Sequence, residues 1–244
     1  MTKENIFDLL RISLKKTIDE NDLAGDNIVV SAKTLNPDEA IGNPEHDDYP
    51  LLVGRERMME AHIRGKPGQA FTDMYGCWEG CLQDILNLEL NNNYRRAVFV
   101  AVLNASLRYN GELDDTRHCK DEGPVECARQ IKNFVHEMGL TPPFGLIGFQ
   151  PRFAETLSGI GELRVVDLDA ANIGQEKYGV LIHPPEGTQK ILAGCRSLFV
   201  TGTTLVNNTI QPFLDLSIPT IFYGVTIAGA AKILGLTRYC AYGL

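Results

Sequence analysis

The chain has 244 residues, of which 44% are hydrophobic, and its formal net charge is −8. This length can supply one large core or two domains of ordinary size. The acidic balance argues against a nucleic-acid partner, because such surfaces need clustered Lys and Arg. A small molecule or a metal ion is the partner that remains.

Neither a membrane span nor a disulfide framework is predicted. No apolar stretch reaches the roughly 18–20 residues that a span needs, and the segment 97–103 is followed at once by Asn104. The first 20 residues carry charges throughout, unlike a signal peptide. We therefore expect a cytoplasmic protein whose six cysteines are reduced thiols or metal ligands.

The first half is predicted to be β-rich and then helical. Ile6, Leu9, Leu10 and Leu14 are spaced as the apolar stripe of an opening surface helix. Strands are expected at 27–31, within 51–63 and at 69–74, a mobile loop at 36–50, and helices at 78–90 and 94–109. The last of these helices is apolar on nearly every side, which predicts that it is buried.

The polar segment 110–124 is predicted to connect the two halves, which we place at residues 1–115 and 116–244. Beyond it, short apolar runs alternate with helical stretches, as in βα units around a parallel sheet. Strands are expected at 144–147, 163–166, 198–200, 220–223 and 239–242, and helices near 152–157, 206–214 and 228–234. The fold class is therefore α/β, with a Rossmann-like second half.

Ligands of such folds bind beyond the carboxyl ends of the strands, so the residues after each run are candidate binding residues. They are Gly148, Gln150, Asp167, Asp169, Thr201, Gly202, Thr203, Thr204, Asn207, Gly224 and Thr226. Each could equally be an ordinary helix cap or turn residue. We expect the loops at 148–150 and 201–204 to lie on neighbouring strand ends.

Asp167 follows Gly148 at a spacing that suits a carboxylate accepting ribose hydroxyls. The glycine pattern of a dinucleotide site is absent, so a nucleoside or another heterocycle fits better. The segment 201–208 could hold an anion ahead of a helix starting near Leu205, or simply cap that helix. Asn104 either braces the core or faces the ligand.

The segment 118–127 is rich in metal ligands. His118, Cys119, Glu126 and Cys127 could bind a transition metal such as zinc, or Cys127 could be a reactive thiol in the first turn of a helix that begins at Pro124. The alternative is a solvated hinge. Cys77 and Cys81 would share one helix face, where core packing is the simpler interpretation.

At 98–110, 145–151, 200–209 and 221–229 the chain resembles the putative heavy-metal chelation family, a family of unknown function. The resemblance implies an enolase N-terminal-like α+β domain followed by a Rossmann-like domain, with a ligand between them. It implies a role in the metabolism of pterin-, flavin- or siderophore-like metal chelators. Some members have a histidine where Phe149 and Gln150 stand here, so no acid–base role is transferred to this position.

The leading hypothesis is a protein that binds a small heterocyclic or nucleoside-like ligand between its halves, with metal-assisted condensation or hydrolysis as the reaction. A non-catalytic metal-binding or delivery protein is the alternative, and an S-adenosylmethionine-dependent methyltransferase is a third. No nucleophile–base pair is legible, so whether the protein is an enzyme stays open. Homo-oligomer formation stays open too.

Overall fold

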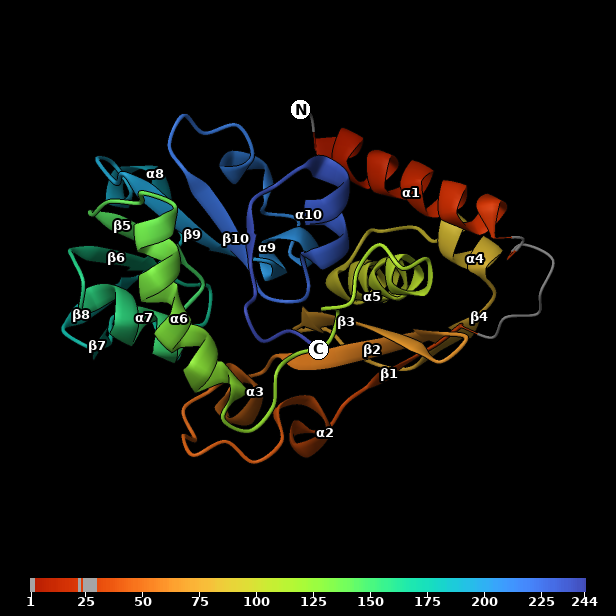
Figure 1. Cartoon of the computed structure of the whole chain (residues 1–244), viewed down its shortest axis with the longest axis horizontal. Coiled ribbons are helices and arrows are strands. Elements are labelled where there is room, and N and C mark those ends of the chain that lie inside the picture. Colours follow the sequence, from red (N-terminus) through yellow and green to blue (C-terminus); the bar gives the residue numbers. More distant parts are fainter. Residues whose placement is uncertain (1–2, 22, 24–29) are drawn as a thin grey trace.

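The computed structural model describes residues 3–21, 23 and 30–244. A four-stranded antiparallel sheet with helices is followed by a seven-stranded, mostly parallel sheet (Figure 1). The predicted α/β class is confirmed. Within the described part of the chain, every helix is too short or too polar to cross a membrane.

The first half is built on the sheet β3-β2-β1-β4. Its strands are β1 (Val30–Thr34), β2 (Arg57–Ile63), β3 (Lys66–Thr72) and β4 (Trp78–Gly80). Its shorter helices are α2 (Pro37–Ile41), α3 (Pro50–Val53) and α4 (Leu82–Asn87). The opening helix α1 (Lys3–Glu20) buries Ile6, Leu10 and Leu14 of its predicted stripe, whereas Leu9 is half-buried.

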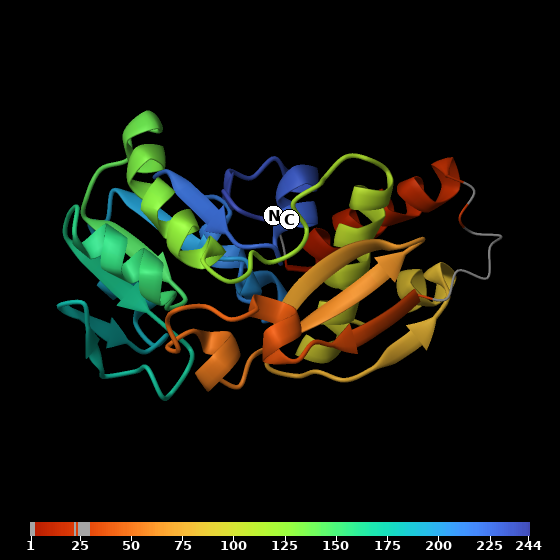
Figure 2. The same ribbon diagram turned by 60° about the horizontal axis from the view of Figure 1, so that its bottom comes forward.

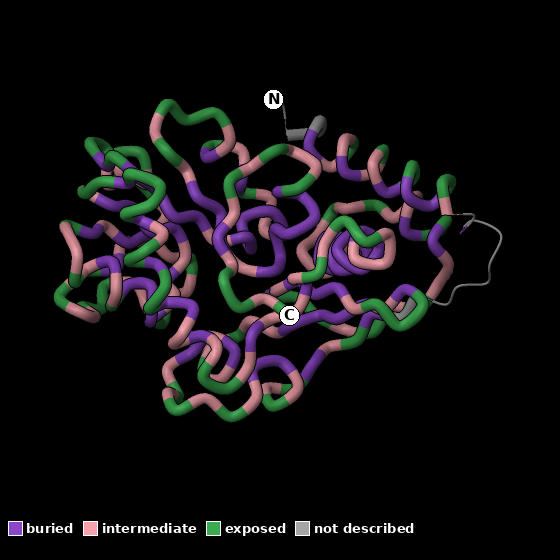
Figure 3. Tube along the Cα trace, viewed as in Figure 1, coloured by how far each residue is buried: buried purple, intermediate pink, exposed green. Residues whose placement is uncertain are grey.

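Helix α5 (Asn93–Tyr109) lies at the centre of the molecule, as its apolar sequence predicts. Figure 1 shows it end-on, with β2 and β3 on one side and α1 and α10 on the other. Burial covers its whole circumference (Figure 3), unlike that of α1. Gly68 on β3 permits this packing, since a Cβ there would lie 2.3 Å from the Ala101 carbonyl oxygen.

The second half forms the sheet β11-β10-β9-β5-β6-β8-β7. Its strands are β5 (Phe144–Ile147), β6 (Leu163–Val166), β7 (Glu176–Lys177), β8 (Val180–His183), β9 (Ser197–Thr201), β10 (Thr220–Tyr223) and β11 (Arg238–Tyr239). Its helices are α6 (Gly123–Glu137), α7 (Pro151–Ser158), α8 (Thr188–Ile191), α9 (Thr203–Val206), α10 (Ala228–Leu234) and the 3-10 turn η1 (Gln211–Phe213). All neighbours are parallel except β7 and β8.

Alternating strand residues divide this sheet between two cores. Leu146 and Phe199 belong to the cluster that contains Ile131 of α6 and Phe153 of α7. Val200, on the opposite face, belongs to the cluster that contains all the buried apolar residues of α5 and much of the first half. The first half therefore covers one face of the parallel sheet, and the two halves share a core.

Four sequence predictions need correction. The expected helix at 78–90 is β4 followed by α4, because the Asp84 carboxylate accepts the Cys81 N–H and starts the helix at Leu82. Cys77 and Cys81 consequently do not share a helix face. The region 51–53 is helical, because Pro50 occupies the first helical position. The helix expected at 206–214 starts at Thr203 and cannot pass Asn208, whose φ is +56°.

Three further outcomes concern strand limits and a loop. The last strand covers only 238–239 instead of 239–242. The first strand is found at 30–34, and most of the predicted 27–31 lies outside the described residues. The loop expected at 36–50 carries α2, whose Asn36 and Glu39 form a reciprocal capping pair. The runs predicted for β5, β6, β10 and α10 are confirmed.

Candidate functional site

The parallel strands run in the order β8-β6-β5-β9-β10-β11, so the chain reverses direction across the sheet between β5 and β9. Ligands of open α/β sheets bind at the carboxyl ends of the strands on either side of such a reversal. Ile147 pairs with Val200, and Thr201 pairs with Tyr223. The prediction that the loops after β5 and β9 are neighbours is therefore confirmed.

Gly148, Thr201 and Tyr223 meet at this edge. A Cβ on Gly148 would lie 2.6 Å from Thr201 Cγ2 and 3.2 Å from the Tyr223 hydroxyl, and its φ of +84° also favours glycine. The Tyr223 hydroxyl donates to the Gly148 carbonyl oxygen at 2.7 Å. Burial raises the pKa of Tyr223, with Asp167 and Glu56 adding to the effect. Tyr223 is therefore a neutral hydroxyl beside two carboxylates.

Asp167 is fixed by the backbone of its own edge. One carboxylate oxygen accepts the Phe149 N–H, and the other accepts the Asp169 N–H at 2.6 Å. Burial raises the pKa of Asp167, although these N–H donors oppose the shift. The carboxylate is thus oriented across the strand ends while each oxygen keeps a further lone pair for a ligand.

Glu56 and Asp73 reach the same edge from the first half. The chain leaves the first sheet after β1, passes through α2 and α3 beneath α6 and α7, and returns at Glu56 (Figure 2). Burial raises the pKa of Glu56 to about 7, and the charges of Asp167, Asp73 and Asp169 contribute. We use the name carboxyl-edge site for the residues at this edge and the carboxylates whose charges act on it: Glu56, Asp73, Asp167, Asp169, Thr201 and Tyr223.

Several predicted binding residues lie at this edge but bond mainly to the protein. Thr201 Oγ1 is 3.0 Å from Thr203 Oγ1, and Thr204 Oγ1 donates to the Thr201 carbonyl oxygen at 2.7 Å. Gln150 caps α7 through the Phe153 N–H. The Asn207 side-chain oxygen accepts from Asn93, which also bonds to Asp73 at 2.7 Å.

The other two predicted glycines at strand ends, Gly202 and Gly224, have different surroundings. Gly202 is closely packed, since a Cβ would lie 2.8 Å from the Ile227 nitrogen. Gly224 has a φ of +90° and open space around it. Helix α9, which follows Gly202, has four residues and no side-chain cap, so it offers little of the dipole that the predicted anion site requires.

Asn104 and Thr226 connect the two halves. The Asn104 amide donates to the Gln69 and Val225 carbonyl oxygens at 2.9 and 3.1 Å, and its oxygen accepts the Gly229 N–H at 2.7 Å. Thr226 accepts the Phe71 N–H at 3.0 Å. Both side chains are buried. Of the two predicted roles for Asn104, the structure favours the brace.

Both thiols of the segment 118–127 are buried, whereas His118 and Glu126 are half-buried. His118 Nδ1 lies 2.6 Å from the Cys119 carbonyl oxygen, and burial lowers the pKa of His118 to about 4. Glu126 forms an ion pair with Arg129. Among residues 3–21, 23 and 30–244, no three His, Cys, Asp or Glu side chains form a group that could hold a metal ion. The predicted zinc set is not assembled in this conformation.

The expected lowering of the Cys127 pKa is wrong. Cys127 does lie in the first turn of α6, and the backbone N–H groups of Ala241 and Tyr242 favour its thiolate. Burial is the larger effect and raises the pKa of Cys127. Burial also raises the pKa of Cys119.

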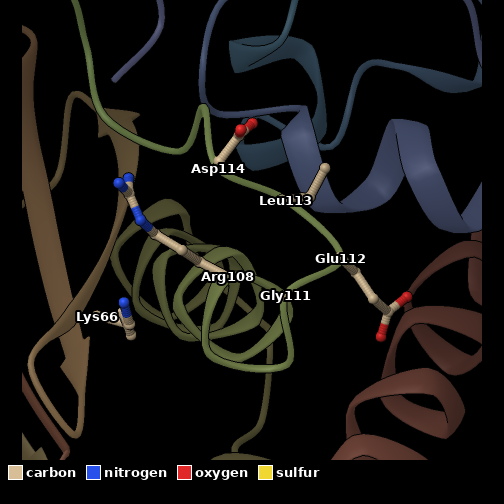
Figure 4. Close-up of a pocket in the computed structure, with 6 residues that line it drawn as sticks. All are labelled: Lys66, Arg108, Gly111, Glu112, Leu113 and Asp114. Atoms are coloured by element: carbon tan, nitrogen blue, oxygen red, sulfur yellow. The ribbon is translucent and has the colours of Figure 1, made fainter.

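A separate hollow of about 330 Å³ lies at the end of α5 (Figure 4). Its lining residues are Lys66, Arg108, Gly111, Glu112, Leu113 and Asp114. Arg108 already donates to the Leu244 carbonyl oxygen at 2.6 Å and to Thr116 at 3.3 Å. None of the predicted binding residues lines this hollow. The hollow is therefore an alternative ligand site, separate from the carboxyl-edge site.

Sequence reasoning missed Glu56, Asp73 and Tyr223. Tyr223 is the last residue of β10 and Asp73 directly follows β3, so inspection of strand ends could have found both. Glu56 gives no such signal, because only the return of the chain from α3 places it beside Asp167.

Residues 142–234, which carry β5 to α10, match the model of DUF364, described as "Putative heavy-metal chelation". The second half of the chain is therefore similar to the DUF364 family. The DUF364 match includes Asp167, Thr201 and Tyr223 but not Glu56 or Asp73. The description names no ligand and no residue.

Two solved DUF364 structures of unknown function share the fold. The one from Pyrococcus horikoshii is 17% identical with a TM-score of 0.54, covering 89% of this chain and 79% of its own. The one from Desulfitobacterium hafniense DCB-2 is 12% identical with a TM-score of 0.50, covering 91% and 85%. No curated protein matches the chain. The DUF364 fold thus extends over both halves.

Proposed function

We propose that this protein binds a small heterocyclic ligand with hydrogen-bond donors, of the metal-chelator type, at the carboxyl-edge site. The observation that carries the proposal is that carboxylates from both halves, Glu56 and Asp167, act on each other and on Tyr223 near the β5–β9 reversal. Carboxylates accept hydrogen bonds from ring N–H groups and ribose hydroxyls.

The polarity of the site supports an organic ligand with donors rather than an anion. Burial raises the pKa of Glu56, and the negative charges of Asp167, Asp73 and Asp169 raise it further. A phosphate or pyrophosphate would be repelled there. The family description agrees with a ligand that itself carries metal-binding nitrogen and oxygen atoms, so that the ligand, not the protein, would hold the metal.

Glu56 is the residue best suited to proton transfer. A carboxyl group with a pKa of about 7 can both donate and accept a proton at neutral pH. The condensation or hydrolysis expected from the sequence would use such a group, with Asp167 orienting the ligand. We assign Glu56 this role within the proposal.

The test is native mass spectrometry of freshly purified protein, with any retained molecule identified by its mass. A panel of nucleosides, pterins, S-adenosylmethionine and zinc alone follows, monitored by thermal shift. We expect a heterocycle to bind, and Asp167→Asn to weaken it about tenfold, through loss of one charged hydrogen bond. Glu137→Gln, at the exposed end of α6, is the control.

Three results would contradict the proposal. Stoichiometric zinc without an organic ligand would favour the metal-binding alternative. Binding of S-adenosylmethionine alone would favour a methyltransferase. A ligand held equally by wild type and Asp167→Asn would place the site elsewhere.

A further inference from the structure

Residues 43–56, which we name the strap, belong to the first half but pack against the second half. They are a second link between the halves, besides the connecting segment 110–124. The strap starts where the Asn43 N–H donates to Asp121 at 2.9 Å and ends at Glu56 in the carboxyl-edge site. Between these points it passes beneath α6 and α7 (Figures 1 and 2). The strap therefore spans the distance from Asp121, ahead of α6, to the carboxyl-edge site.

The middle of the strap is held to the second half by an ion pair whose arginine is buried. Asp48 Oδ2 lies 2.7 Å from Arg152 Nη2, and the Tyr178 hydroxyl donates to the same oxygen at 2.9 Å. Arg152 also donates to Tyr178, and its guanidinium lies over the Tyr178 ring. The Arg152 side chain is 8% exposed and the Asp48 side chain 35%, so the guanidinium is shielded from water while the carboxylate is partly open to it. We name Asp48, Arg152 and Tyr178 the latch.

The latch adjoins the carboxyl-edge site. Arg152 is the second residue of α7, which begins directly after the loop of Gly148 and Gln150. Tyr178 stacks on Phe149, whose N–H donates to Asp167. The contacts that hold the strap and those that orient Asp167 are thus part of one connected set.

Closure of the latch leaves polar atoms without partners. Asp48 Oδ1, Tyr49 Oη and Arg152 Nε are buried and have no hydrogen-bond partner among the described residues. Unpartnered buried polar groups oppose the state that buries them. Tyr49 and Leu51 favour closure, because they are buried with Met58 and Val225. Burial of apolar side chains therefore stabilises the closed strap, while the unpartnered polar atoms destabilise it.

We propose that the strap is a lid on the carboxyl-edge site, and that the latch holds it shut and so positions Glu56. Its role as a gate for a ligand rests on the proposed function. The movement of the strap itself does not, since it depends only on contacts within the chain.

Two measurements on the full-length, ligand-free protein test the lid. The first is hydrogen exchange of the amides at 52–54, which bond within α3. The second is modification of Glu56 and Asp167 by a water-soluble carbodiimide with glycine ethyl ester, located by mass spectrometry. In Asp48→Asn we expect both to become at least tenfold faster, while amides in β5 and β9 keep their rates.

Glu155→Gln is the matched control. Glu155 also pairs with Arg152, at 2.8 Å, but it lies on α7 and does not touch the latch oxygen of Asp48. Its exchange and modification rates should stay within twofold of wild type. Tyr178→Phe, which keeps the ring, is the second latch variant and should follow Asp48→Asn if that variant folds poorly.

Unchanged rates in both latch variants, or an equal increase in Glu155→Gln, would overturn the lid. Because the probes are water and a carbodiimide, the lid can fail while ligand binding at the carboxyl-edge site holds. Ligand binding can equally fail while the strap opens as expected.

Discussion

At the scale of single residues, the protein concentrates carboxylates where a Rossmann-like sheet receives its ligand. Asp167 is held by two backbone N–H groups, whereas the pKa of Glu56 is raised by burial and by the charges of other carboxylates. The two carboxyl groups are therefore suited to different roles. Asp167 is suited to orientation and Glu56 to carrying a proton.

Replacement of Glu56 by Gln should change the pH dependence of stability. An unfolded Glu loses its proton near pH 4.5, but folded Glu56 keeps it until about pH 7. The stabilisation that accompanies protonated Glu56 is complete below pH 4.5 and is lost as the pH rises through 7. The Gln side chain stays neutral, so Glu56→Gln should be more stable than wild type by about 1–3 kcal/mol at pH 8.

Urea unfolding at pH 5 and pH 8, followed by circular dichroism, measures this difference. Glu137→Gln is the control, and it should change stability equally at both pH values. An advantage of Glu56→Gln that is the same at pH 5 and pH 8 would show that Glu56 ionises normally.

The cysteines give a second prediction at this scale. Cys119 and Cys127 are buried and their pKa values are raised, whereas Cys77 is exposed. Iodoacetamide at pH 8 should therefore alkylate Cys77 at least tenfold faster than Cys127, since only the accessible thiolate reacts. Peptide mass spectrometry over time checks this order. Alkylation of Cys127 first would restore the reactive-thiol interpretation.

At the scale of elements, α5 does the most to connect the structure. Its Asn104 satisfies carbonyl oxygens on β3 and after β10 and the N–H of Gly229 in α10. The same helix packs on the first sheet through Gly68. One helix of the first half thereby fixes the orientation of the second.

Asn104→Ala should lower the free energy of unfolding by about 2–4 kcal/mol, because it leaves several buried backbone groups without partners. Ser106→Ala is the matched control: Ser106 is equally buried in α5, but its hydroxyl bonds only within the helix, to the Leu103 carbonyl oxygen. Chemical denaturation of the two variants measures the contrast. Equal losses would mean that Asn104 contributes only packing.

The elements also show what the sequence can reveal. Strands β5, β6 and β10 were predictable because each is a short apolar run with turn residues behind it. Helix α5 was predictable from its length and composition. Helices α3, α4 and α9 are four to six residues long, and local caps decide their limits more than periodicity does.

At the scale of the whole molecule, the candidate site is made by both halves. The sequence predicted Asp167, Asp169 and Thr201, since they directly follow or end strands. It did not predict Tyr223, the arrival of Glu56 or the latch between Asp48 and Arg152. The last two depend on contacts across about a hundred positions of the chain. Such contacts follow from tertiary packing, which no local pattern encodes.

Hydrogen exchange with and without the heterocycle identified by mass spectrometry tests the central claim most directly, because it locates the ligand on the whole molecule. We predict protection at 53–57, 148–150, 167–169 and 201–204, the segments that form the carboxyl-edge site. Protection confined to the hollow of Lys66, Arg108 and Asp114, with those four segments unchanged, would contradict the account.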